Sequence, residues 1–548
     1  MVGASSSDPG GARADTSVTA IFHLAHAEGR GALNSEELRL LLAGLGIGLG
    51  TGATSPATLP AVELHVRLEN TREFGLVISA GLGGLDGALA DCSHGQDRAC
   101  VHASTELTDA QDFFLRFRRT LAYRKLAAIS GRDGTPLPDA QLEAVFARLL
   151  DLAGRQSTGG PGAPFVLDVL ELDPVQVGDA VTARAARCEF GAPAAGRLPR
   201  PLHKINKLVH PASIGLVGVS ASGMNFGRII LRNLMGSGYP REQLRVIRPG
   251  ATEIDGVQCV ASLQALDRKL DLLIVAIAAD AVYGLVDEIL ATDAAEAVML
   301  IPGGLGETPA SREPAAALAA RINAAHAGDG GGPIFLGANC LGVVSHPGSY
   351  DSWFIPLERL PKLRKKPERN SVMLSQSGAF MITRISQNPW LDPRYMLAVG
   401  NQIDLTHGDL LGYFADRPEI ETIGVYIEGF RERDGLDFVK AVRRAVQNGK
   451  QVIVYKAGTT ASGADAVMAH TASIAGDPEL FDSVVRHAGA IVAPDFTAFD
   501  DLLYLAGALH RKQIGGRRLG AISGAGFEAV GMADSLEAGA CSMEMGRL

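Results

Sequence analysis

From residue 213 onward, short apolar runs alternate with amphipathic stretches. Phe226, Ile230 and Leu234 recur every four residues, a spacing typical of one helix face. Continuous apolar strands that alternate with helices indicate a parallel sheet covered on both faces, so the fold class is α/β. The pattern predicts strands at Ile214–Val219, Leu244–Ile247, Leu272–Ile277, Val298–Ile301 and Ile334–Leu336.

A basic connector at residues 360–369 leads to a second α/β unit. Its predicted strands are Ser371–Leu374, Tyr395–Val399, Thr422–Ile427, Gln451–Tyr455 and Ala490–Val492. A third unit begins with a strand at Leu519–Ser523, followed by a turn and a helix. A lone strand–helix unit cannot form its own core, so we expect it to dock on the rest of the chain or on a partner.

The N-terminal third has a less regular pattern. Residues 1–15 are small, polar and glycine-rich, which indicates disorder, and residues 16–50 have helical periodicity. The remaining expectations are a linker at residues 53–60, strands at Glu63–Leu68, Gly75–Ala80 and Phe165–Leu172, a helical region at residues 108–155, and a linker at residues 191–198.

Composition narrows the function classes. The chain has 548 residues, a net charge of −9 and 47% hydrophobic residues, which argues for several globular domains and against a nucleic-acid partner. The N-terminus has no apolar core for a signal peptide, and no apolar run reaches the length of a membrane span. The six cysteines are scattered without a CxxC pair, which favours reduced thiols and a cytoplasmic location.

The run from Gly218 to Gly227 follows a predicted strand and opens a helix, the context in which a helix N-terminus binds phosphate. The next strand ends in Arg248-Pro249, without the acidic residue that binds a ribose in NAD sites. The run therefore favours a nucleotide-bearing ligand other than NAD and weakens an oxidoreductase reading. A purely structural glycine turn is the alternative.

Loops at two later strand ends, Pro302–Gly304 and Gly337–Gly342, should converge on the same crevice, because ligands of open parallel sheets bind at the carboxyl ends of strands. The second loop contains Cys340. An inert thiol in the core is the alternative to a functional role for this cysteine.

A further strand–turn–helix motif contains Ser375, Gln376, Ser377 and Gly378, and a similar one spans Ser523 to Gly526. Each offers hydroxyl and backbone donors at a helix N-terminus, so two such ends aimed at one point would hold a phosphoryl group. Ordinary N-capping by serine is the alternative.

His470 lies in a run of small residues between Lys456 and Gly476, which predicts a phosphate-wrapping loop. Imidazole is a nucleophile near neutral pH, and Glu428 at a strand end would orient it by a hydrogen bond. The alternatives are a surface or capping histidine and a solvated strand-end glutamate.

Seven motifs together extend this interpretation beyond single loops. They occur in the order IGLVGVSASGMNFGRIILRNL, IPGGLGE, GANCLGV, LSQSGAF, VGNQIDL, YIEGF and AHTASIAG. From about residue 203 to 536, the chain resembles NDP-forming acyl-CoA synthetases of the ADP-forming acetate–CoA ligase type, relatives of the succinyl-CoA synthetase α subunit. The stretches VELHVRLENTREFGLVISAGLGG and VLELDPVQVGD resemble parts of the family's ATP-grasp domain.

The resemblance implies a multidomain α/β protein. Its expected parts are a disordered N-terminus (1–15), a partial ATP-grasp-like domain (16–188), a linker (189–208), a CoA-binding Rossmann-like domain (209–350), a succinyl-CoA-ligase-like flavodoxin domain (370–512) and the incomplete start of a second ligase-type domain (515–548).

The resemblance also implies a reaction: an acid, CoA and ATP give acyl-CoA, ADP and phosphate, reversibly, through an acyl phosphate and a phosphohistidine. His470 would be phosphorylated and oriented by Glu428, and Glu171 and Asp173 would help to hold Mg²⁺. The implied CoA-site residues are Gly218, Ser220, Gly223, Gly227, Pro249, Asn339 and Cys340. The implied phosphate-site residues are Ser375, Gln376, Ser377, Gly378, Gly524, Ala525 and Gly526.

The chain departs from this family in its nucleotide-binding half. It has no His-Lys-Ser-Asp stretch, and Ala88 and Thr182 stand where the family has acidic residues. We therefore expect a homo-oligomer or a complementary subunit, with a small carboxylic acid and CoA as ligands. The alternative function is a CoA-binding paralogue or partial subunit without nucleotide-dependent activity of its own.

Overall fold

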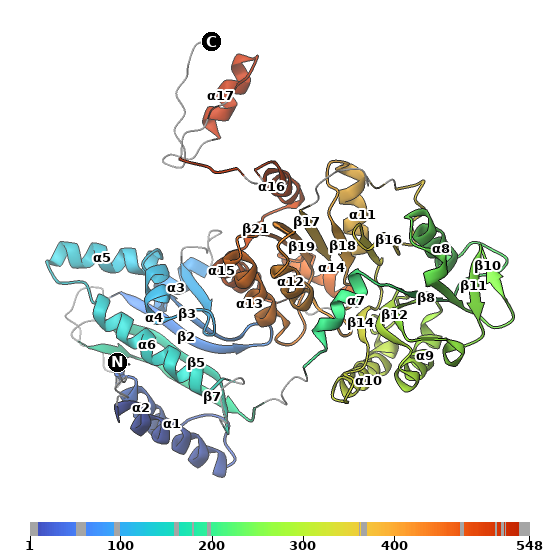
Figure 1. Ribbon diagram of the computed structural model, residues 1–548. Coiled ribbons are helices and arrows are strands. Elements are labelled where there is room, and N and C mark those ends of the chain that lie inside the picture. Colours follow the sequence, from blue (N-terminus) through green and yellow to red (C-terminus); the bar gives the residue numbers. More distant parts are fainter. Residues whose placement is uncertain are drawn as a thin grey trace, which may run out of the picture.

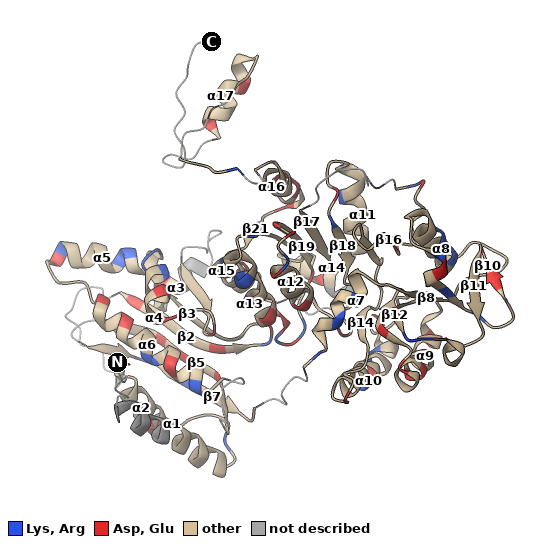
Figure 2. Ribbon diagram, viewed as in Figure 1, with Lys and Arg blue, Asp and Glu red and all other residues tan. Residues whose placement is uncertain are grey.

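The computed structural model describes residues 9–50, 62–91, 99–157, 164–177, 180–193, 199–360, 362, 370–471, 476–509, 512–516, 520 and 522–535. The strands in these ranges form three sheets, and helices pack against each of them (Figure 1). Acidic and basic residues are interspersed along the described helices (Figure 2). None of these helices is both long and apolar enough to span a membrane.

The first sheet is mostly antiparallel and has the strand order β1-β6-β5-β2-β3-β4, with β7 paired to β5. Its strands are β1 Gly48–Leu49, β2 Glu63–Thr71, β3 Gly75–Leu82, β4 Cys100–Ser104, β5 Val166–Val177, β6 Val181–Ala183 and β7 Ala186–Gly191. Its helices are α1 Pro9–Ala27, α2 Ser35–Gly44, α3 Gly84–Asp91, α4 Ala110–Phe117, α5 Leu121–Asp133 and α6 Asp139–Arg155. Helix α1 begins at Pro9, inside the segment expected to be disordered.

The second sheet has the order β10-β11-β9-β8-β12-β13-β14, and all its pairs except β10–β11 are parallel, as the alternating pattern predicts. The strands are β8 Ile214–Val217, β9 Leu244–Ile247, β10 Glu253–Ile254, β11 Val257–Val260, β12 Leu270–Val275, β13 Ala295–Leu300 and β14 Ile334–Gly337. The α-helices are α7 Ile205–Val209, α8 Phe226–Gly236, α9 Ala279–Thr292 and α10 Pro309–His326.

The third sheet has the order β16-β15-β18-β17-β19-β20-β21 and is parallel from β18 to β21. Its strands are β15 Val343–Ser345, β16 Tyr350–Asp351, β17 Ser371–Ser375, β18 Tyr395–Ala398, β19 Thr422–Ile427, β20 Gln451–Lys456 and β21 Ile491–Ala493. The helices that follow β17 are α11 Gly378–Gln387, α12 His407–Ala415, α13 Asp434–Gln447, α14 Ala461–Thr471, α15 Pro478–Ala488 and α16 Phe496–Ala508. Strand β15 falls inside the segment expected to belong to the CoA-binding domain (209–350), but it pairs with β18 of the third sheet.

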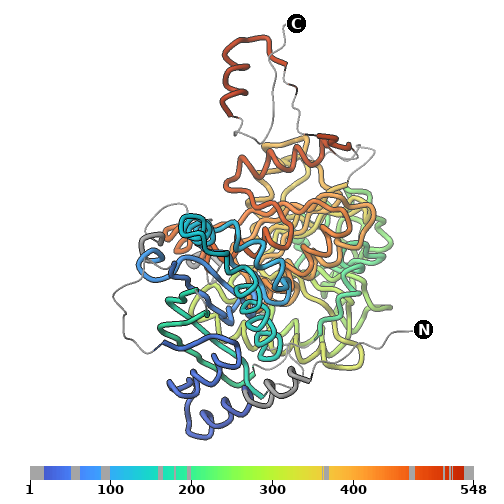
Figure 3. Tube along the Cα trace, turned by 90° about the vertical axis from the view of Figure 1, so that its left-hand side faces the viewer, coloured from blue at the N-terminus to red at the C-terminus, as the bar shows by residue number. Residues whose placement is uncertain are grey.

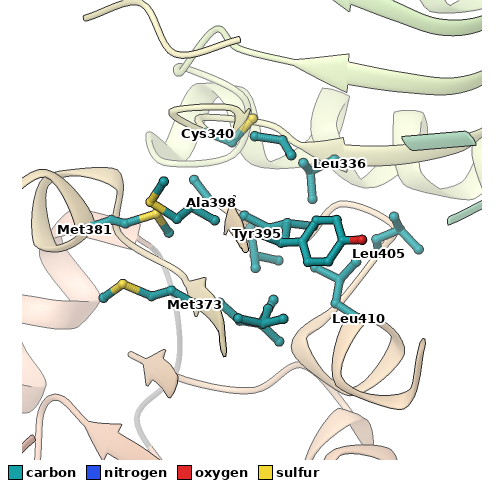
Figure 4. Close-up of a cluster of buried hydrophobic side chains, with 14 of the residues drawn as sticks. Leu336, Cys340, Met373, Met381, Tyr395, Ala398, Leu405 and Leu410 are labelled. Atoms are coloured by element: carbon teal, nitrogen blue, oxygen red, sulfur yellow. The ribbon is translucent and has the colours of Figure 1, made fainter. Parts of the chain in front are cut away.

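The second and third sheets share one hydrophobic core. Side chains from both units form the cluster in Figure 4, which includes Leu336 and Cys340 on one side and Met373 and Tyr395 on the other. The backbone segment 401–405 runs along β14, where Ile403 N donates to Gly337 O at 2.8 Å. Burial of shared apolar surface and backbone pairing therefore hold the two units together.

The hairpin between β2 and β3 connects the first sheet to the third. At its tip, Arg433 N donates to Arg72 O at 2.6 Å, and Leu436 N donates to Glu73 O at 2.9 Å. Phe74 lies against Phe430 with ring centroids 5.8 Å apart. The tip of a hairpin far away in sequence thus packs beside the end of β19.

Helix α17 (Gly526–Asp534) lies apart from the three sheets in both views (Figures 1 and 3). None of its residues is buried. Residues 520, 522 and 523 are not in a strand, so the strand predicted at Leu519–Ser523 is wrong in the part of it that the structure describes.

Candidate functional site

The glycine-rich loop after β8 approaches its neighbours too closely for a side chain at two positions. A Cβ atom on Gly218 would lie 2.2 Å from Ala276 O, and one on Gly227 would lie 2.6 Å from Gly218 O. Asn225 caps α8 by accepting from Arg228 N, and its amide also donates to Gly218 O. These contacts fix a tight turn from strand to helix, the backbone form that exposes N–H donors to phosphate.

The remaining residues predicted for the loop support this turn. Ser220 Oγ accepts from Gly223 N at 3.1 Å, so both residues stabilise the loop itself. Pro249, after the end of β9, is exposed. Arg248, which the sequence analysis did not select, donates from Nη1 to Val219 O at 2.8 Å. The available sequence signal for this arginine was a basic residue at the strand end where NAD sites have an acidic residue.

Arg248 provides a test of the loop as a nucleotide-phosphate site. We expect Arg248→Gln to weaken CoA binding about tenfold, which corresponds to roughly 1.4 kcal/mol, because a guanidinium is a strong partner for phosphate. Isothermal titration with CoA measures the effect. The matched control is Arg241→Gln, at an exposed arginine in the same unit. Equal CoA affinity in both variants would contradict the prediction.

The loops after β13 and β14 converge as predicted. Asn339 N donates to Pro302 O at 2.9 Å, and Asn339 has a positive φ of 52°. Cys340 is only 2% exposed, and its Sγ donates to Leu300 O at 3.3 Å. Burial raises the pKa of the Cys340 thiol to about 12. The thiol is therefore an unreactive part of the core (Figure 4), and Cys340 can contribute to a ligand site only through its backbone.

The loop from Ser375 to Gly378 lies directly beside this region. A Cβ atom on Gly378 would lie 2.6 Å from Leu341 Cβ, so glycine allows α11 to approach the loop after β14. Ser377 caps α11 by accepting from Phe380 N at 3.3 Å, and Ser375 Oγ donates to Ser377 O at 2.6 Å. The structure thus places the predicted phosphate loop at residues 375–378 next to the loop after β14.

Gln376 and Glu428 come together at the ends of the adjacent strands β17 and β19. Gln376 Oε1 accepts from Glu428 N at 2.8 Å and from Gly429 N at 3.2 Å. Glu428 is 4% exposed, so it is not the solvated glutamate of the alternative reading. Its Oε1 accepts from the Tyr426 hydroxyl at 3.2 Å.

Lys456, at the end of β20, is a site residue that the sequence analysis did not select. Its Nζ donates to Glu428 O at 2.8 Å, and burial lowers the pKa of its ammonium group. The available sequence signal was a lysine directly after the apolar run Gln451–Tyr455. The lysine fixes the backbone of Glu428 and places a positive charge beside it.

His470 is in the last turn of α14, so the prediction of a loop at this position is wrong. Its side chain and residues 472–475 lie outside the described residues. The chain is described again from Gly476, where a Cβ atom would lie 2.2 Å from a carboxylate oxygen of Glu73. Glu73 is buried, and burial raises the pKa of its carboxyl group. The hairpin of the first sheet therefore reaches Gly476, six residues after His470.

Two sets of predicted site residues lie away from the region of Gln376 and Glu428. Gly524, Ala525 and Gly526 precede and begin α17, which lies apart from the three sheets, so this structure does not bring the two predicted phosphate-binding helix ends together. In the first sheet, Glu171 forms an ion pair with Arg187 at 3.2 Å, and Asp173 accepts from Gly84 N at 3.0 Å. Within the described ranges, no three His, Cys, Asp or Glu side chains form a group suited to a metal ion.

Gln402 connects His407 to the site. His407 Nδ1 lies 3.0 Å from Gln402 Oε1, and Gln402 Nε2 donates to Gly429 O at 3.4 Å. Burial lowers the pKa of His407 to about 3, whereas its ordinary value is 6.5. Between these pH values the unfolded chain takes up a proton that the native state excludes, so acidification should lower the free energy of unfolding by up to about 1.4 kcal/mol per pH unit. Denaturant unfolding at pH 7, 6 and 5 should show a smaller pH slope in His407→Gln. An unchanged slope would contradict this assignment.

Comparisons with known proteins identify both α/β units. Residues 212–346 match the model of a CoA binding domain, and residues 368–506 match the model of a succinyl-CoA ligase like flavodoxin domain. The "Acetate--CoA ligase [ADP-forming] II subunit alpha" of Pyrococcus furiosus is 26% identical over 330 residues, which cover 60% of this chain and 67% of that protein.

Two further relatives have names of the same kind. The "Acetate--CoA ligase [ADP-forming]" of Methanocaldococcus jannaschii is 26% identical over 61% of this chain, but the match spans only 44% of that protein. A solved "dinucleotide forming Acetyl-coenzyme A synthetase 1" of Ca. Korarchaeum cryptofilum, in complex with phosphate and ADP, has a TM-score of 0.53 and 28% identity. That match covers 60% of this chain and 68% of the other.

Proposed function

We propose that this chain, a relative of the ADP-forming acetate–CoA ligases, is the part of an acid–CoA ligase that binds CoA and transfers a phosphoryl group. The supporting observation is the contact between Gly378 and Leu341, which joins the candidate phosphate loop to the loop after β14. A CoA thiol and a phosphoryl group bound at these loops would be held close together.

In the proposed reaction, phosphate attacks the carbonyl carbon of an acyl-CoA. The C–S bond breaks, CoA leaves as the thiol, and an acyl phosphate forms. An imidazole nitrogen of His470 then attacks phosphorus, the bond between phosphorus and the acyl oxygen breaks, and the free acid leaves as the carboxylate. Ser377 and the first N–H groups of α11 would stabilise the charge on phosphate, and Glu428 would accept the other imidazole N–H.

Transfer of the phosphoryl group between the histidine and a nucleotide needs a second site. We propose that a complementary subunit or a second copy of the chain supplies or completes this site. The first sheet does not show where Mg²⁺ would bind, because Glu171 is paired with Arg187 and Asp173 accepts a backbone N–H. The proposed steps therefore use only residues of the second and third sheets.

The experiment tests the half-reaction that needs no nucleotide. Purified full-length chain is incubated with radiolabelled phosphate and a panel of acyl-CoA thioesters, and acid-labile, base-stable label on the protein is measured. Label that requires acyl-CoA supports the proposal. Bound CoA without label from any thioester would instead show a CoA-binding paralogue. A parallel incubation with Mg²⁺ and γ-labelled ATP shows whether the chain completes the nucleotide step alone.

A further inference from the structure

The tip of the hairpin between β2 and β3 is hydrogen-bonded to the loop that follows β19. Arg72 donates from Nη1 to Phe430 O at 2.8 Å. Further along this loop, Arg433 N donates to the backbone oxygen of Arg72 at 2.6 Å. Leu436 N donates to the backbone oxygen of Glu73 at 2.9 Å. These hydrogen bonds hold the loop against a hairpin that lies 358 residues earlier in the chain.

Arg72 is itself fixed by a buried partner. Its Nη2 donates to Glu73 Oε1 at 2.7 Å, and Glu73 is 5% exposed. Burial raises the pKa of the Glu73 carboxyl group, whereas the nearby cations Arg72 and Lys456 act in the opposite direction. Because a guanidinium is planar and its donors have a fixed geometry, this ion pair directs the other nitrogen toward Phe430 O. The guanidinium is thus a paired donor with a defined direction and not a free cation for an anionic ligand.

The backbone of Glu428 is held by side chains of its own sheet. Gln376 Oε1 accepts from Glu428 N and from Gly429 N. Lys456 Nζ donates to Glu428 O. These partners fix the peptide groups on either side of Glu428, and the orientation of its side chain also depends on what holds the chain beyond Gly429.

Gly429 separates Glu428 from Phe430, and glycine has the least restricted backbone of all residues. Gln402 donates to Gly429 O at 3.4 Å, which is long for a hydrogen bond. Arg72 donates to the next carbonyl, that of Phe430, at 2.8 Å. The shorter and charge-assisted of these two contacts therefore comes from the first sheet.

We propose that Arg72 is a positioning residue of the phosphoryl-transfer site, which acts through the backbone of Phe430 to fix the orientation of Glu428. The inference rests on the proposed function, since it concerns the glutamate that would orient His470. It adds a residue of the first sheet to the site, although Arg72 takes no part in bond making. The site is complete only while the hairpin is docked, so phosphoryl transfer depends on the first unit even when no nucleotide is involved.

The rate at which the full-length chain is labelled by radioactive phosphate and acyl-CoA tests this role. Arg72→Met keeps a long side chain but removes its donors. We expect it to slow labelling roughly tenfold, because small misplacements of a catalytic group slow a reaction strongly. Arg72→Lys should be labelled faster than Arg72→Met, since its ammonium group can still donate to a carbonyl. Isothermal titration should give the same CoA affinity for all three chains, which shows that the variants are folded.

The matched control is Lys440→Met. Lys440 forms an exposed ion pair with Glu106 across the same junction between the first and third sheets. The substitution thus removes a cation from this junction without removing the hydrogen bond to Phe430. The control should retain the full labelling rate and the full CoA affinity.

A double variant separates positioning from a general loss of structure. In a Glu428→Gln chain, Arg72→Met should slow labelling by less than about twofold more, because the glutamate through which Arg72 acts is already absent. A further tenfold loss in the double variant would overturn the proposal. An unchanged rate in Arg72→Met alone would do the same.

Hydrogen exchange of the peptide that contains residues 426–430 distinguishes this proposal from the proposed function. Its amides should exchange several-fold faster in Arg72→Met than in Lys440→Met, whether or not the chain is labelled. If the unchanged chain acquires no label, the proposed function fails, and faster exchange still supports the hold of Arg72 on the glutamate segment. Equal exchange in the two variants would overturn the positioning role.

Discussion

A His470→Asn chain should acquire no acid-labile phosphate label from acyl-CoA and phosphate, whereas the unchanged chain becomes labelled. Asparagine has no imidazole nitrogen to attack phosphorus, so the covalent step cannot occur. The position lies in the last turn of α14, in a run of small residues, and the polar side chain of asparagine should be tolerated there. Radiolabel on the purified protein after alkaline and after acid treatment measures the effect.

Two further variants separate chemistry from folding. His203→Asn, at an exposed histidine outside the candidate site, should retain full label. Glu428→Gln should slow labelling on the order of 100-fold, because the amide no longer stabilises a charged imidazole, while CoA binding stays unchanged. Persistent label in His470→Asn would show that another residue carries the phosphoryl group.

Phe74→Ala should lower the stability of the contact between the first and third sheets by about 3–5 kcal/mol. Phe74 is 1% exposed and belongs to the same buried cluster as the core of the other two units. Its ring meets Phe430 and Phe481 with centroids 5.8 and 6.4 Å away. Removing the ring leaves a cavity at the tip of the hairpin, next to Arg72 and Glu73.

Thermal unfolding and limited proteolysis of the full-length chain check this prediction. The variant should unfold at a lower temperature than the unchanged chain, and the protease should cleave it faster between the first and second units. Phe527→Ala is the control, because Phe527 is 79% exposed on α17 and its loss should change stability by less than about 0.5 kcal/mol. A change of less than 1 kcal/mol in Phe74→Ala would mean that the hairpin is not held by this residue.

Several structural features follow from local sequence alone. Strands β9 and β19 have the predicted bounds, because an apolar run between turn residues leaves little choice when both faces of a sheet are covered. The turn after β8 requires glycine at Gly218 and Gly227 for close backbone packing, and this signal is visible in the sequence. The pairing of Gln376 with Glu428 was not predicted, because it depends on β17 and β19 being neighbours in the sheet, which the local sequence does not determine.

Other features have no local signal. The placement of His470 in a helix was missed because small residues are compatible with either a loop or a helix. Strand β15 pairs with β18, which lies some 50 residues later in the chain, so the boundary between units could not be located from composition. The inert character of Cys340 depends on burial between two sheets, which the spacing of residues does not encode.

The sequence by itself therefore determined the alternating α/β units, the glycine turns and the order of the motifs that resemble acid–CoA ligases, because these depend on periodicity and on backbone geometry within a few residues. Only the tertiary structure decided that Arg72 and Glu73 of the first sheet reach the candidate site. Contacts between distant segments arise from how whole surfaces pack, and no short stretch of sequence carries that information.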